Sequence, residues 1–186
     1  MMILIGLTGS GKSTVAKIIE ISGVGKRVKR QTTRSLRNDD DLSLIQKVKV
    51  IDNGKMDFVI QGWGNDLYCI SNKEIEVVQA EKKIPVIELG SYYDAEKLKE
   101  IYKHAKIILI EREIKTKDIE EICKQRGMDL HDINERVKSF YEDENELIEN
   151  RKNIDYIFFN NKNINDLTID VIKLVSEIRW DKDGYY

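Results

Sequence analysis

Apolar residues along the chain gather in short runs, and longer segments with helical periodicity separate them. The four clearest runs are Met2–Gly6, Ile84–Leu89, Lys106–Glu111 and Asp155–Phe159. Continuous apolar runs of this length are typical of strands that are buried on both faces of a parallel sheet. Because strand and helix alternate, the sequence predicts an α/β fold with a parallel sheet between two layers of helices.

The segments between these runs carry helix signals. Ser71 and Glu74 have the spacing of a capping box, and Asp94 stands at the start of another helical pattern. The stretch Leu130–Lys152 places its apolar residues near one face, and Asn163–Ile178 predicts a last helix.

The region from Ser35 to Ile70 breaks this alternation. Its β-prone pieces and the turn between them are Ile45–Ile51, Asp52–Gly54, Met56–Ile60 and Leu67–Ile70. Short strands around turn residues predict a small antiparallel flap that is inserted into the α/β core.

The 186 residues are enough for one domain, and their net charge of -2 gives no general attraction to nucleic acid or anionic lipid. Cys69 and Cys123 form no disulfide framework and no CxxC metal pair, which favours a reduced, intracellular protein with two small buried cysteines. The apolar start Met1–Leu7 fits neither a signal peptide nor a membrane span.

The first apolar run leads into a phosphate-binding motif. Gly6 to Ser13 reads GLTGSGKS and matches GxxxxGK[ST], with helical sequence directly after it. Glycines let successive backbone N–H groups face one anion, and the next helix adds its positive end. We expect Lys12 to reach the β- and γ-phosphates and Ser13 to bind Mg²⁺. A glycine-rich turn that binds nothing is the alternative. The predicted ATP-binding residues of this segment are Gly6, Thr8, Gly9, Ser10, Gly11, Lys12, Ser13 and Thr14.

A second motif narrows the class of P-loop protein. Thr32–Arg37 reads TTRSLR and resembles the TTRxxR signature of the guanylate kinase family. Further segments similar to that family follow in order: Gly64–Tyr68, Gln125–Gly127, Ile133–Arg136 and Tyr156–Asn161. The resemblance spans about residues 3–178.

This resemblance implies one domain with three parts. The core, with five parallel strands, would comprise residues 1–34, 84–114 and 154–178, the acceptor flap about 35–83, and a helical lid about 115–153. It further implies a cytoplasmic nucleoside monophosphate kinase, a monomer or homodimer, that uses ATP with Mg²⁺ and transfers the γ-phosphate to a (deoxy)nucleoside monophosphate. We expect no membrane partner and no nucleic-acid partner.

The family resemblance also implies roles for residues outside the P-loop. Arg34 and Arg37, on an exposed loop, would bind the acceptor phosphate together, although they could also be solvated surface charges. Arg126 and Arg136 would close over the transferred phosphoryl group, or remain on a helix surface. Glu88 ends a buried strand and would act on Mg²⁺ or its waters. Tyr68, Gln61 and Glu88 complete the predicted acceptor site, and Asn160 joins the ATP site.

The acceptor-base end departs from the family pattern. Guanine recognition there uses two acids and a hydroxyl, but the aligned segment Phe58–Gln61 has no carboxylate, and Ile70 and Gly90 stand at the other two positions. A tyrosine is also missing near Ile45–Lys47. We therefore expect GMP to be a weak acceptor.

Three other functions remain open. A kinase of the same fold could act on another phosphorylated acceptor, such as a sugar phosphate or a modified nucleotide. A guanylate-kinase-like binding module would have lost catalysis, and such modules typically have degraded P-loops, whereas this P-loop is intact. A free-standing NTPase is the third alternative.

Overall fold

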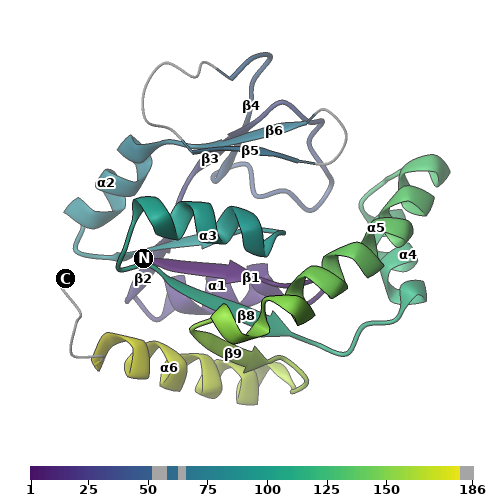
Figure 1. The fold of residues 1–186 in the computed structure, drawn as a ribbon. Coiled ribbons are helices and arrows are strands. Elements are labelled where there is room, and N and C mark those ends of the chain that lie inside the picture. Colours follow the sequence, from purple (N-terminus) through teal and green to yellow (C-terminus); the bar gives the residue numbers. More distant parts are fainter. Residues whose placement is uncertain (52–57, 63–65, 181–186) are drawn as a thin grey trace.

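A parallel sheet of five strands forms the centre of the protein (Figure 1). The computed structural model describes residues 1–51, 58–62 and 66–180. In spatial order the strands are β2 (Gly25–Arg27), β7 (Ile84–Glu88), β1 (Met2–Ile5), β8 (Lys106–Glu111) and β9 (Tyr156–Phe159). Every neighbouring pair is parallel. The four apolar runs are confirmed as strands, and the fifth strand, β2, has the sequence GKR.

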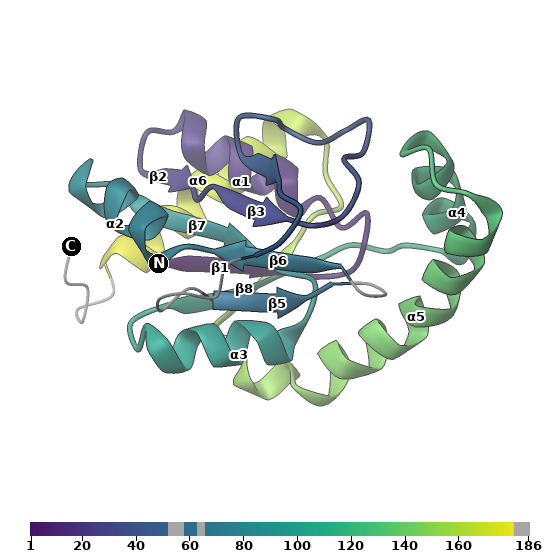
Figure 2. The same cartoon turned by 90° about the horizontal axis from the view of Figure 1, so that it is seen from above.

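Helices cover both faces of this sheet (Figures 1 and 2). They are α1 (Lys12–Ile21) and α6 (Ile164–Trp180) on one face, and α2 (Asn72–Ala80) and α3 (Tyr92–Ile101) on the other. Alternate residues of β1 separate the two cores: Met2 and Leu4 belong to the cluster of α1 and α6, and Ile3 and Ile5 to the cluster of α3. The predicted three-layer αβα architecture is confirmed.

A second, smaller sheet lies over α3 (Figure 1). Its strands, in spatial order, are β4 (Ile45–Lys47), β3 (Arg30–Thr32), β6 (Leu67–Ile70) and β5 (Phe58–Gln61). The pairs β3–β6 and β5–β6 are antiparallel, but β3 and β4 are parallel. The predicted antiparallel pairing is therefore wrong for β4, because the link 33–44 is a long crossover and not a hairpin turn.

The small sheet begins earlier in the chain than position 35, since β3 precedes the arginine motif. Its buried Ile60 and Ile70 join the same core cluster as Tyr92 of α3. The predicted turn Asp52–Gly54, and positions 64 and 65 of the predicted turn before Tyr68, lie outside the described residues.

A pair of helices projects to one side of the core (Figure 1). They are α4 (Thr116–Gln125) and α5 (Leu130–Glu149), and the short 3₁₀ helix η1 (Arg151–Asn153) returns the chain to β9. We call α4 and α5 the lid. Its own small core contains Ile119, Cys123, Ile133 and Phe140. Within the residues that the structure describes, none of the helices is long and apolar enough to cross a membrane.

One carboxylate joins the lid helix α5 to the core. Glu146 accepts hydrogen bonds from the Ser91 hydroxyl at 2.8 Å and from the backbone amides of Tyr92 and Tyr93. These amides open α3, where unpaired N–H groups and the helix dipole favour a negative charge. Glu146 therefore acts as the N-terminal cap of a helix on a distant part of the chain.

We predict that Glu146→Ala lowers the free energy of unfolding by about 2 kcal/mol, because it removes a cap and a charge at the helix N-terminus. Glu146→Gln should lose about half of that, since the amide oxygen can still accept. Chemical denaturation measures both. Glu149→Ala, at an exposed position of the same helix, is the matched control, and an equal loss in that variant would contradict the capping role.

Candidate functional site

The loop between β1 and α1 has a backbone that only glycine adopts easily. Gly6, Gly9 and Gly11 have φ angles of 143°, 84° and 91°. A Cβ on Gly11 would lie 2.1 Å from the Asn160 side-chain nitrogen, and one on Gly6 would lie 2.4 Å from the Ile110 carbonyl oxygen. The loop thus packs against the ends of β8 and β9 so closely that Gly6 and Gly11 have no room for a side chain.

Lys12 folds back over this loop. Its Nζ donates to the carbonyl oxygens of Gly6 at 2.6 Å and Leu7 at 3.0 Å. Burial lowers the pKa of Lys12 to about 8; nearby Glu88 opposes this change, and Arg136 and Arg126 add to it. The nearby carboxylates therefore do not fully compensate the burial of the ammonium group, as expected at a site that binds an anion.

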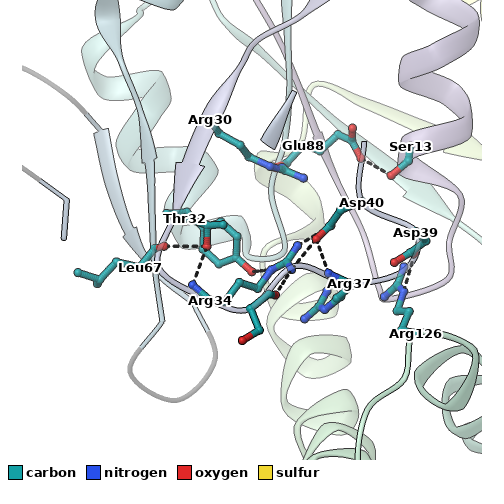
Figure 3. Close-up of polar contacts among 12 residues, drawn as sticks. Ser13, Arg30, Thr32, Arg34, Arg37, Asp39, Asp40, Leu67, Glu88 and Arg126 are labelled. Atoms are coloured by element: carbon teal, nitrogen blue, oxygen red, sulfur yellow. Dashed lines mark hydrogen bonds and ion pairs between the residues drawn. The ribbon is translucent and has the colours of Figure 1, made fainter. Parts of the chain in front are cut away.

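Ser13 and Glu88 meet at the entrance to the loop (Figure 3). The Ser13 hydroxyl donates to Glu88 Oε2 at 2.5 Å, across the C-terminal end of the central sheet. A hydroxyl and a carboxylate are oxygen ligands of the kind that Mg²⁺ prefers, and this ion commonly keeps several waters beside one or two protein ligands. Among the described residues, no group of three or more His, Cys, Asp or Glu side chains that could hold a metal ion is found.

A cleft of about 150 Å³ opens beside this pair, between the central sheet and the small sheet. Its charged lining is rich in arginine: Arg27, Arg30, Arg34, Arg37 and Arg126, with Asp39, Asp40, Asp41 and Glu88. Ser13 lines it as well, so the cleft is continuous with the phosphate-binding loop.

Arg34 is buried, and most of its N–H groups donate to other groups of the protein (Figure 3). Its side chain is 6% exposed, which corrects the expected exposed loop position. It forms a two-pronged pair with Asp40 at 2.6 and 2.7 Å, and donates to Tyr68 Oη and the Ser35 carbonyl, each at 2.7 Å. A guanidinium has five N–H groups, so one is left for a ligand.

Asp40 balances this arginine. Burial would raise the pKa of Asp40, but hydrogen bonds from Arg34 and from the Arg37 backbone amide, at 2.7 Å, outweigh it and lower the pKa. The carboxylate therefore stays ionised and fixes the conformation of the loop that carries both arginines.

Arg37 differs from Arg34 although it lies on the same loop. Across residues 1–51, 58–62 and 66–180, no carboxylate lies within ion-pair distance of its guanidinium. Burial lowers its pKa, and Arg34, Arg126 and Arg136 act in the same direction. Several cations thus face one region of the cleft, which makes Arg37 the better placed of the two to hold an anion.

The lid brings two arginines to this region. Arg136 of α5 donates to the Thr8 hydroxyl of the loop, and lies 3.9 Å from Asp143. Arg126, at the end of α4, donates to Asp39 at 2.8 Å. Both act electrostatically on Lys12, so the structure places the three predicted catalytic side chains together.

The other predicted residues take several positions. Asn160 is buried and donates to the Ser10 carbonyl at 2.7 Å, so it supports the loop from behind. The buried Ser10 hydroxyl has no hydrogen-bond partner among the described residues. Thr14 is exposed on α1, and Gln61 is exposed at the end of β5, away from the lining of the cleft. Cys69 and Cys123 are buried, as predicted.

Sequence reasoning missed the three aspartates and two of the arginines of the cleft. Arg27 pairs with Glu20 at 2.9 Å and with Asp41 at 3.1 Å, and Arg30 donates to the Glu88 carbonyl at 3.2 Å. The signal that could have found these aspartates is the run Asp39–Asp41, which follows the TTRSLR motif after one asparagine, since neighbouring opposite charges commonly form ion pairs.

Comparison with known proteins identifies the fold. Guanylate kinase from Anaplasma phagocytophilum superposes with a TM-score of 0.66 at 15% sequence identity, over 97% of this chain and 86% of that one. A gluconokinase from Sinorhizobium meliloti 1021 gives 0.48 at 11% identity, over 95% and 91% of the two chains. Dephospho-CoA kinase from Campylobacter jejuni gives 0.47 at 14% identity, over 95% and 96%. No protein-family model and no curated protein matches the sequence. The chain shares the P-loop kinase fold of guanylate kinase, and its activity must be argued from the site.

We predict that Arg34→Gln and Asp40→Asn each lower the free energy of unfolding by about 3–5 kcal/mol, because each leaves an unpaired buried charge. The double variant Arg34→Met/Asp40→Leu should recover most of that loss. Arg37→Gln, on the same loop but without an acidic partner in the described structure, should change stability by no more than about 0.5 kcal/mol. Equal losses for Arg34→Gln and Arg37→Gln in urea unfolding would contradict this division.

Proposed function

We propose that this protein is an ATP-dependent phosphotransferase that moves the γ-phosphate of ATP to a phosphorylated acceptor, most simply a nucleoside or deoxynucleoside monophosphate. The observation that carries the proposal is the continuity of the phosphate-binding loop with an arginine-lined cleft. A nucleotide-hydrolysing enzyme needs the loop but has no use for a second anion site. The fold shared with guanylate kinase is consistent with this activity.

The donor would bind at the loop between β1 and α1. Lys12 would leave its two carbonyl partners for the β- and γ-phosphates of ATP. Ser13 and Glu88 would hold Mg²⁺ or its waters. When bound, this ion neutralises charge on the phosphate oxygens.

The acceptor phosphate would bind at Arg37, with the remaining N–H of Arg34 beside it. Tyr68 supports Arg34 through its hydroxyl. One acceptor phosphate oxygen would attack the γ-phosphorus in line, the bond to the bridging oxygen of ADP would break, and ADP would leave. The acceptor is already anionic and needs no base, so positioning and charge neutralisation provide the rate. Arg126 and Arg136 would contact the phosphoryl group from the lid.

A kinase with the same donor site and a different phosphorylated acceptor is the second candidate. The base end of the cleft favours it, since Ile70 lines the cleft where the family places a hydroxyl, and a Cβ on Gly90 would meet no atom within 4 Å. Every acid that lines the cleft is already bonded within the described structure. Guanine would therefore compete with these contacts for an ionised acceptor, and a donor left without one costs about 1–3 kcal/mol.

The protonation of Lys12 yields a pH test. Its pKa is about 8 without ligand, and a triphosphate favours the charged form, so binding should take up a proton. Affinity for ATP should be level well below pH 8 and fall above it, by up to about tenfold per pH unit. Calorimetry in two buffers of different ionisation enthalpy measures both effects. The proposed role of Lys12 fails if no proton is taken up at pH 8.

The proposal itself is tested by transfer from radiolabelled ATP to a panel of acceptors: GMP, dGMP, AMP, CMP, UMP, dTMP and pentose phosphates. We expect transfer to at least one of them and a poor rate with GMP. Lys12→Ala should lower the rate by about 10²–10³, whereas Lys17→Ala, at an exposed position of α1, should not. Phosphate release without any labelled acceptor would contradict the proposal in favour of an NTPase.

A further inference from the structure

The charges of the cleft do not balance within the protein. Three of its five arginines have carboxylate partners: Arg27 with Asp41, Arg34 with Asp40, and Arg126 with Asp39. The fourth acid, Glu88, accepts from Ser13. Two guanidinium groups, those of Arg30 and Arg37, have no carboxylate partner in the described part of the chain.

Arg30, like Arg37, could bind an anion, but it lies in another part of the cleft. It stands on β3 and is partly buried, and its Nη1 donates a hydrogen bond to the Glu88 carbonyl oxygen at 3.2 Å. This contact holds it at the floor of the cleft, at the end of β7. Figure 3 shows the side chains of Arg30 and Arg37 at different parts of the cleft: Arg30 lies beside Glu88, and Arg37 lies beside Asp40.

The surroundings of Arg30 favour an anion over a neutral base. The uncharged walls of the cleft are largely apolar, and each lining carboxylate already accepts a hydrogen bond from an arginine or from Ser13. A base carbonyl would accept a hydrogen bond but leave the charge of Arg30 uncompensated in a partly desolvated position. A phosphate supplies both acceptor oxygens and charge, and the planar fork of arginine matches it.

We propose that the acceptor of this enzyme carries a second phosphate group and that Arg30 binds it, while Arg37 binds the phosphate that receives the γ-phosphoryl group. This inference rests on the proposed function and makes Arg30 a specificity-determining residue of the acceptor site. The second phosphate does not react; it only orients the acceptor.

The experiment compares acceptors in pairs that differ by one phosphate. A nucleoside 5′-monophosphate is matched with its 3′,5′-bisphosphate, and a pentose 5-phosphate with the pentose bisphosphate, which separates a nucleotide source of the second phosphate from a sugar source. Calorimetry gives Kd, and the labelled-ATP assay gives kcat/KM. In at least one pair the bisphosphate should bind about tenfold or more tightly, since its second phosphate would form charge-assisted hydrogen bonds with Arg30.

Arg30→Gln should abolish this difference and leave the Kd of the monophosphate within about twofold. Arg30→Lys should keep part of the difference, and Lys29→Gln, at the exposed neighbouring position, should keep all of it. The wild-type comparison alone tests the inference if Arg30→Gln fails to fold.

The outcomes separate the two proposals. Equal affinity for both members of each pair, or an Arg30→Gln effect confined to particular bases, overturns the second phosphate site and leaves the phosphotransferase intact. Tight, Arg30-dependent binding of a bisphosphate without any transfer overturns the proposed function and leaves the anion site.

Discussion

The tight passage from β1 into α1 is the constraint on which the rest of the site depends. Gly6 and Gly11 leave no space for a Cβ, because the Ile110 carbonyl and the Asn160 amide occupy it. The loop therefore keeps its form only if β8 and β9 lie beside β1 in the observed order, and the loop in turn aims its N–H groups and α1 at one point. The anion site thus depends on the same strand order as the parallel sheet. For this reason the strand, the glycine-rich turn and the lysine form a motif that can be recognised in the sequence.

Most strands and helices of the core could be predicted from the sequence. The runs at β1, β7, β8 and β9 are apolar on both faces, and the helices between them carry clear periodicity and caps. The strands β2 and β3 have the sequences GKR and RQT, which give no apolar signal, and they form only because neighbouring strands offer unpaired edges. The parallel pairing of β3 and β4 was missed for the same reason: a three-residue polar strand does not reveal which way its partner runs.

The site was predicted by residue type but not by exposure. TTRSLR drew attention to Arg34 and Arg37, which both line the cleft, but the pattern treated them as equivalent. The two arginines differ because Asp40 forms an ion pair with Arg34 alone. This pairing results from tertiary packing that the local sequence does not specify. An aspartate in a run of three acids is usually solvated, and only the fold of the link 33–44 turns one of them onto a buried guanidinium.

Burial thus divides the arginines of the cleft into fixed and exchangeable groups. The side chains of Arg34 and Asp40 are 6% and 7% exposed, so breaking their ion pair would leave a desolvated charge. A ligand therefore has to bind beside the intact pair. The Arg126–Asp39 pair is 26% and 51% exposed, and ion pairs of this kind contribute about 0–1 kcal/mol. A phosphate can therefore displace Asp39 from Arg126 at little cost. Because Arg126 belongs to the lid and Asp39 to the loop of the small sheet, that exchange provides a physical link between filling the cleft and positioning the lid.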